Sequence, residues 1–159
     1  MKNKKRVEWK VLIVSLVVVY LVAFVGSLFT SSAVNSDWYD SVRPAITPPN
    51  WVFPVVWNIL FFLIALSLYF SWINSKSSDV RKEIVIVFGI NFLLNIFWSV
   101  LYFGLKSPQY AFVEIFILWV SIIVMIYTTY KIDRKAAYLL IPYLLWVSFA
   151  VVLNWLSIV

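Results

Sequence analysis

A stripe of polar residues interrupts an otherwise apolar part of this sequence. Asn91, Asn95 and Ser99 recur at every fourth position, a spacing that places them on the same side of a helix. Such side chains can join neighbouring helices, each hydrogen bond being worth about 1 kcal/mol or less in a bilayer. They can instead line a buried cavity and orient a ligand there. Both interpretations are open, and the second makes Asn91 and Asn95 candidate ligand-binding residues.

Tryptophan is the second candidate residue type, with nine copies in the chain. Indole favours membrane interfaces, which accounts for the tryptophans near the ends of apolar stretches, namely Trp9, Trp38, Trp72 and Trp155. Trp98 and Trp146 lie well inside such stretches, where an indole N–H lacks water and needs a partner. Trp57 shares a helical face with Phe61 and Ala65, just after a proline-rich segment. These residues predict an aromatic wall around a small-molecule cavity.

Glu114 is the one acid or base within the long apolar stretches, and an intramembrane carboxylate is by default a candidate functional residue. Lys106 is close enough in the sequence to pair with it, so we favour a structural or protonated carboxyl. The chain has no cysteine and no histidine, which removes thiolate nucleophiles, disulfides and the usual proton shuttle. Paired carboxylates, a Ser/Lys dyad and a glycine-rich phosphate loop are also missing. We predict no metal site and no machinery for hydrolysis or phosphoryl transfer.

The candidate residues are embedded in membrane-like sequence. Of the 159 residues 64% are apolar and only 13% are charged, far from the composition of soluble proteins. Five apolar stretches reach the roughly 20 residues that cross the hydrocarbon core. They predict an all-α integral membrane protein, a single domain over residues 1–159 with transmembrane helices at about 11–30, 54–73, 84–105, 108–130 and 136–158. Residues 31–53 form a long aromatic loop, which we call the lid and expect to fold over one mouth of the bundle.

The net charge of +6 is distributed by membrane side. The N-terminus and the second and fourth loops carry 11 of the 13 basic residues, whereas Arg43 and Lys106 stand alone on the other side. By the positive-inside rule the N-terminus is cytoplasmic, and the lid, the third loop and the C-terminus lie outside. The charge therefore encodes topology, and no nucleic-acid partner is predicted.

Three segments carry a family resemblance. WYDSVRPAITPPNWVFPVVWNILF is similar to a WY…KP…PP.W.F…W signature, NFLLNIFWSVLYFG to an N…N..WS..FF segment, and AAYLLIPYLLWVSFAVVLNW to an LL.PY..W..FA..LN ending. Together they resemble the TspO/MBR family, the tryptophan-rich sensory proteins, translocator proteins and peripheral benzodiazepine receptors. The motifs occur in the family's order on an independently predicted five-helix layout.

The resemblance implies a five-helix bundle, commonly a homodimer, with a cavity that opens toward the first loop and accepts porphyrins, sterol-like lipids and isoquinoline or benzodiazepine ligands. Carried over by position, the cavity contacts would be Tyr39, Pro48, Trp57, Phe61, Asn91, Asn95, Trp146 and Ala150. We add Trp98 to the predicted cavity contacts because it lies inside an apolar stretch. Trp51 is expected to hold the lid in place over the cavity and to contact the ligand. With no histidine or cysteine in the chain, we expect no resident cofactor and a metal-free ligand such as protoporphyrin IX or a related tetrapyrrole.

Three functions remain open from the sequence. The first is a membrane tetrapyrrole-binding sensory or translocator protein, with a porphyrin or lipid-like small molecule and membrane lipids as partners. Some bacterial family members are reported to degrade protoporphyrin in light, which would make Trp57 and Trp146 catalytic. The third is a transporter of tetrapyrroles or lipids. Two departures from the family bear on ligand choice: Ile46 stands where a tryptophan is frequent, and no basic residue follows Lys135 to complete the cholesterol motif of animal members.

Overall fold

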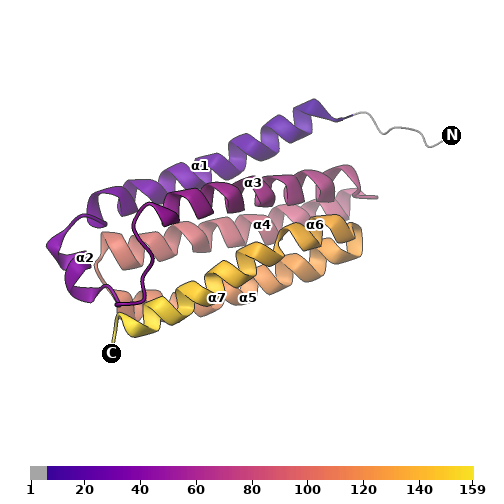
Figure 1. Ribbon diagram of the computed structural model, residues 1–159. Helices are drawn as coiled ribbons and strands as arrows, with labels where there is room; N and C mark the ends of the chain where they lie inside the picture. Colours follow the sequence, from indigo (N-terminus) through magenta and orange to yellow (C-terminus); the bar gives the residue numbers. More distant parts are fainter. Residues whose placement is uncertain (1–6) are drawn as a thin grey trace.

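The computed structural model describes residues 7–159, which form a bundle of long helices lying side by side (Figure 1). Among these residues, five helices are long and apolar enough to cross a membrane. The predicted all-α integral membrane fold is therefore confirmed. The basic residues Lys2, Lys4, Lys5 and Arg6, on which part of the topology prediction rests, lie outside the described residues.

The elements run in the order α1 (Trp9–Ala33), α2 (Asp37–Val42), α3 (Val52–Ile73), α4 (Ser78–Ser99), a π-helical turn η1 (Val100–Gly104), α5 (Pro108–Ile132), α6 (Arg134–Leu139) and α7 (Ile141–Leu156). The five spans are α1, α3, α4 with η1, α5, and α6 with α7. The fourth element begins six residues before the predicted start at Ile84. The cause is local: Ser77 caps the helix by accepting a hydrogen bond from the Val80 N–H at 3.3 Å, so the charged turn that follows is already helical.

Prolines shape two of the helix starts. Pro54 lies in the first turn of α3, where its missing N–H costs no helical hydrogen bond. Pro142 lies in the first turn of α7, directly after the turn at Leu140 that separates α6 from α7. The last predicted helix is thus two helical segments in one span.

Two clusters of buried side chains hold the bundle together. The larger one lies between α3, α4, α5 and α7 and includes Ile64, Phe88, Ile115, Met125 and Tyr143. The smaller one lies beside α2 and joins Tyr39 to Tyr102, Phe103 and Ala111. In contrast, α1 is peripheral: it packs on α3, α4 and η1, and Val19 is its only member of the larger cluster.

The lid is folded rather than extended. Ser36 caps α2 by accepting a hydrogen bond from the Tyr39 N–H at 3.3 Å. The Trp38 ring meets the edge of Tyr102 at 5.9 Å between centroids, which places α2 against η1. The Asn50 amide donates to the Val34 carbonyl at 3.3 Å and ties the later part of the lid to the end of α1.

The start of α1 and the C-terminus lie at opposite ends of the bundle, with the C-terminus at the end that carries α2 (Figure 1). Arg43 and Lys106 lie at that α2 end. The opposite end carries the basic residues that the sequence assigned to the second and fourth loops, namely Lys76 before α4, Arg81 and Lys82 in the first turns of α4, Lys131 in the last turn of α5, and Arg134 and Lys135 at the start of α6. This arrangement is the one on which the predicted orientation depends; the orientation itself stays a prediction.

Candidate ligand cavity

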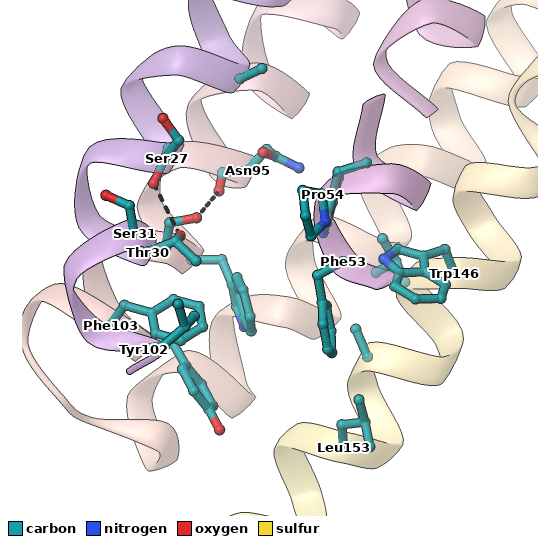
Figure 2. Close-up of a pocket in the computed structure, with 18 of the residues that line it drawn as sticks. Ser27, Thr30, Ser31, Phe53, Pro54, Asn95, Tyr102, Phe103, Trp146 and Leu153 are labelled. Carbon is teal, nitrogen blue, oxygen red and sulfur yellow. Dashed lines mark hydrogen bonds between the residues drawn. The ribbon is translucent and has the colours of Figure 1, made fainter. Parts of the chain in front are cut away.

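A cavity of about 640 Å³ lies inside the half of the bundle next to α2 (Figure 2). This volume is within the range of roughly 300–1,000 Å³ that is usual for drug-sized ligands. Its wall includes most of the residues predicted from the sequence, namely Tyr39, Trp57, Phe61, Asn95, Trp98, Trp146 and Ala150. Residues far apart in the chain therefore meet around a single space, which α3, α4 and α7 build together with α1 and the lid.

Pro48, Trp51 and Asn91 do not line the cavity. Trp51 is 68% exposed, so its side chain does not seat the lid as expected. Asn91 is buried behind the wall, where its amide donates to the Ser121 hydroxyl at 2.8 Å and its carbonyl accepts from the Tyr143 hydroxyl at 3.3 Å. A ligand contact at these three residues stays a prediction that the cavity wall does not support.

Trp57 and Trp146 form the aromatic sides of the cavity. Trp57 stacks on Phe61 with ring centroids 5.2 Å apart and also meets the edge of Tyr143 at 6.1 Å. Trp146 meets the edge of Phe53 at 5.9 Å. Among the described residues neither indole N–H has a hydrogen-bond partner in the protein, so both donors are free to bind a ligand.

Trp98 finds the partner that its position inside an apolar stretch requires. Its indole N–H donates to the Asn154 carbonyl at 3.1 Å, and the Asn154 amide donates in turn to the Pro108 carbonyl at 2.8 Å. Because this donor is already used, Trp98 can offer a ligand only its ring, which stacks on Tyr102 at 5.1 Å. A helix-joining role and a cavity-lining role coexist in this one residue.

Asn95 is the amide of the polar stripe that lines the cavity. Its amide nitrogen donates to the Tyr143 hydroxyl at 3.1 Å, and that hydroxyl donates to Asn91. The two interpretations of the stripe therefore separate: Asn91 joins helices, whereas Asn95 joins helices and also faces the cavity.

The π-helical turn η1 supplies wall residues that were missed from the sequence. The Leu105 N–H donates to the Val100 carbonyl, five residues back, at 2.7 Å. With this extra residue in the turn, Tyr102 and Phe103 both line the cavity, and the Tyr102 hydroxyl bonds the Ser157 hydroxyl at 2.8 Å. Such turns occur frequently at functional sites, but no residue pattern in the sequence marks this one.

Helix α1 contributes a hydroxyl-bearing edge that was also missed. Ser27, Thr30 and Ser31 line the cavity (Figure 2). The Ser27 hydroxyl donates to the Phe24 carbonyl at 2.7 Å, and the Thr30 hydroxyl donates to the Gly26 carbonyl at 3.2 Å. Because these protons are used within the helix, the two oxygens can act toward a ligand only as acceptors.

Glu114 lies outside the cavity wall and is 4% exposed. Among the described residues neither of its carboxyl oxygens has a hydrogen-bond partner. The pairing with Lys106 considered from the sequence is wrong, because the Lys106 ammonium lies over the Trp38 ring at 5.8 Å. The structure gives Glu114 no role in the cavity.

The phenol of Tyr39, in the lid, has a raised pKa. Burial raises the pKa of Tyr39 to about 12, and the neighbouring Tyr102 adds to the rise. Its ring packs on Phe103 at 5.8 Å between centroids. The lid therefore presents a neutral phenol to the cavity over the physiological pH range.

Taken together, the fold and the cavity define an integral membrane protein that encloses an aromatic, sparsely polar ligand cavity in a five-helix bundle. This chain belongs to the TspO/MBR family, whose sequence profile matches residues 14–158. It is 40% identical over 146 residues to the tryptophan-rich protein TspO of Archaeoglobus fulgidus, covering 90% of this chain and 92% of that protein. It is 37% identical over 137 residues to the protein of the same name from Chlorobaculum tepidum, covering 84% of each. The translocator protein of Ovis aries is 30% identical over 122 residues, covering 74% of this chain and 71% of that protein.

Proposed function

We propose that this protein is a membrane tetrapyrrole-binding sensory or translocator protein whose ligand is protoporphyrin IX or a related metal-free tetrapyrrole. One observation carries the proposal: Trp57 from α3 and Trp146 from α7 line the same cavity with both indole N–H groups unused by the protein. A flat, largely apolar macrocycle gains by stacking on indole, worth about 0.5–1.5 kcal/mol for an aromatic pair beyond the burial of area.

The chemistry of the wall supports a metal-free ligand. The chain has no histidine or cysteine, the residues that most often hold haem iron. What the wall offers besides aromatic rings is a small set of amides and hydroxyls, among them Asn50, Asn95 and Ser99. These groups can orient the polar edge of a ligand within an apolar site.

The relatives favour the sensory and translocator classes, because one from Cereibacter sphaeroides is named a tryptophan-rich sensory protein and those from Ovis aries and Bos taurus are named translocator proteins. The unused indole groups also favour a second function, light- and oxygen-dependent degradation of the bound porphyrin with Trp57 and Trp146 as participants. A transporter of tetrapyrroles or lipids is the third candidate function, and we propose that the protein assembles as a homodimer.

Dark titration of protoporphyrin IX into the purified protein in nanodiscs tests the binding function. We expect saturable binding, and we expect Trp57→Ala to weaken it by about tenfold or more, since tenfold corresponds to about 1.4 kcal/mol and the change removes a stacking surface. The matched control is Trp155→Ala, because Trp155 is 49% exposed and lies outside the cavity wall. Absent binding, or equal loss in both variants, would contradict the proposal.

The same samples under light distinguish the second function. A product that needs light and oxygen in the wild type, and that disappears in a Trp57→Phe/Trp146→Phe double variant, would make the protein an enzyme. Tight dark binding with no light-dependent product would retain the sensory or translocator function.

A further inference from the structure

The exposed residues of the cavity wall gather on one side of the bundle. Most lining residues are buried or half-buried. Those that are exposed are Tyr20, Phe24, Ser27 and Ser31 of α1 and Pro54 and Asn58 of α3. Phe24 lines the cavity and is still 60% exposed, so this wall is a single side chain thick. The cavity therefore opens between α1 and α3.

The lid closes the route that the family resemblance led us to expect. Its lining residues Pro44, Thr47 and Asn50 are half-buried, and Tyr39 is buried. The hydrogen bond from the Asn50 amide to the Val34 carbonyl fastens the lid to α1. Access from the lid side is therefore covered.

The gap between α3 and α7 is also closed at the level of the cavity. The Phe53 and Trp146 rings meet edge to face at 5.9 Å across it (Figure 2). None of the α7 residues that line the cavity is exposed. Of the sides of the cavity wall built from described residues, the α1–α3 side is the one with exposed residues.

The opening between α1 and α3 has defined ends. Toward the middle of the bundle, the Tyr20 hydroxyl donates to the Asn58 carbonyl at 3.3 Å and bridges the two helices. Toward α2, the opening ends beside Ser31, where Asn50 bonds Val34. The stretch of α1 from Tyr20 to Ser31 rises about 16 Å at 1.5 Å per residue, long enough for the edge of a flat macrocycle. Because α1 and α3 are both long and apolar enough to cross a membrane, we expect the opening to face lipid rather than water.

We propose that this opening is a lateral portal through which a flat amphiphile dissolved in the bilayer reaches the cavity. The inference rests on the proposed function and names the class and source of its ligand: a molecule with a rigid apolar body and a polar edge, taken from the lipid phase. Apolar lining suits the body, and the acceptor oxygen of Ser27 at the rim suits a polar edge that carries N–H or O–H donors. Figure 2 shows Ser27 and Ser31 on α1, with Pro54 across the opening on α3.

The test is to obstruct the portal without touching the aromatic walls. Ser27→Trp places an indole in the opening, whereas Leu21→Trp adds the same group to a residue of α1 that is 57% exposed and outside the cavity wall. Both variants are placed in phosphatidylcholine vesicles, and the binding and release of bilayer-dissolved protoporphyrin IX are followed by its own fluorescence. We expect Ser27→Trp to slow association by about tenfold, because its indole stands in the path of the ligand, and Leu21→Trp to associate at the wild-type rate.

The outcomes separate the portal from the binding function. Unchanged rates in Ser27→Trp, or a changed Kd with an unchanged association rate, would overturn the portal and leave the binding function standing. A wild type without saturable binding would overturn both. If circular dichroism shows that Ser27→Trp does not fold, Ser31→Trp at the other end of the opening takes its place with the same expectation.

Discussion

At the residue scale, the tryptophans of the cavity differ in what they can still do. Trp98 has used its indole N–H to hold Asn154, which in turn holds the Pro108 carbonyl. Trp57 and Trp146 have not used theirs within the described residues. An unused donor that lines a cavity is available to a ligand, whereas a used one stabilises the helix packing. Three residues of one type thus divide between ligand recognition and architecture.

Tyr39 gives a prediction on pH at this scale. Its pKa is raised from 10.0 to about 12 by burial, so the folded protein holds this proton more tightly than the unfolded chain does. The stability that results is complete below about pH 10 and is lost as the pH rises through about 12. We expect the thermal midpoint of the wild type in nanodiscs to fall over this window. The thermal midpoint of Tyr39→Phe, which has no ionisable group at this position, should fall less over the same pH window.

The control for this experiment is Tyr110→Phe, because Tyr110 is 71% exposed and should leave the alkaline fall unchanged. If the thermal midpoint falls equally steeply with pH in the wild type and in Tyr39→Phe between about pH 10 and 12, Tyr39 is not the group that causes the alkaline loss of stability.

At the element scale, the π-helical turn η1 sets the shape of the cavity near α2. The extra residue in this turn allows Tyr102 to stack on Trp98 and bond Ser157 while the adjacent Phe103 also lines the wall. An ordinary α-helix advances about 100° per residue at 3.6 residues per turn, so removing one residue would rotate everything that follows by that amount.

Deletion of Val100 tests this role of η1. We expect an uninterrupted α-helix in which Tyr102 no longer reaches Ser157, and a protoporphyrin affinity lower by about tenfold, since two aromatic wall residues are displaced. Helical content by circular dichroism should be retained. Deletion of Lys76, an exposed residue of the α3–α4 loop at the far end of the bundle, is the control and should bind as the wild type does. Equal binding by the Val100 deletion would show that the turn does not shape the site.

At the scale of the whole molecule, the distribution of basic residues and the number of spans together predict how the bundle is oriented in the membrane. The described basic residues near the α3–α4 and α5–α6 connections lie at one end, and Arg43 and Lys106 lie at the α2 end with the C-terminus. With five spans among residues 7–159, the start of α1 and the end of α7 are expected on opposite sides of the membrane. The positive-inside rule then predicts that the α2 end, with the cavity half of the bundle, lies outside.

Orientation is directly testable because the chain has no cysteine. We expect Val159→Cys, at a position that is 80% exposed at the α2 end, to react with a membrane-impermeant maleimide in intact expressing cells. A single cysteine at Ser77, in the α3–α4 loop, should react only after lysis. The reverse pattern would show that the bundle is inserted the other way.

The sequence by itself determined the membrane class, the five spans and most of the aromatic wall. Hydropathy is a local property, so the length of each apolar stretch could be found without knowing its neighbours. Trp57, Phe61 and Trp146 were found from their positions within helices and from the family motifs, and the structure places all three in the cavity wall.

Only the tertiary structure decided what depends on contacts between helices. Asn91 and Asn95 share a helical face, but Asn91 meets Ser121 while Asn95 reaches the cavity. Lys106 is close to Glu114 in sequence, yet its ammonium lies over the Trp38 ring. The hydroxyl edge of α1 and the portal beside it depend on how α1 and α3, each built from its own local pattern, pack beside the cavity. No periodicity within one helix encodes the distance to the next, because that distance is set by packing across the whole bundle.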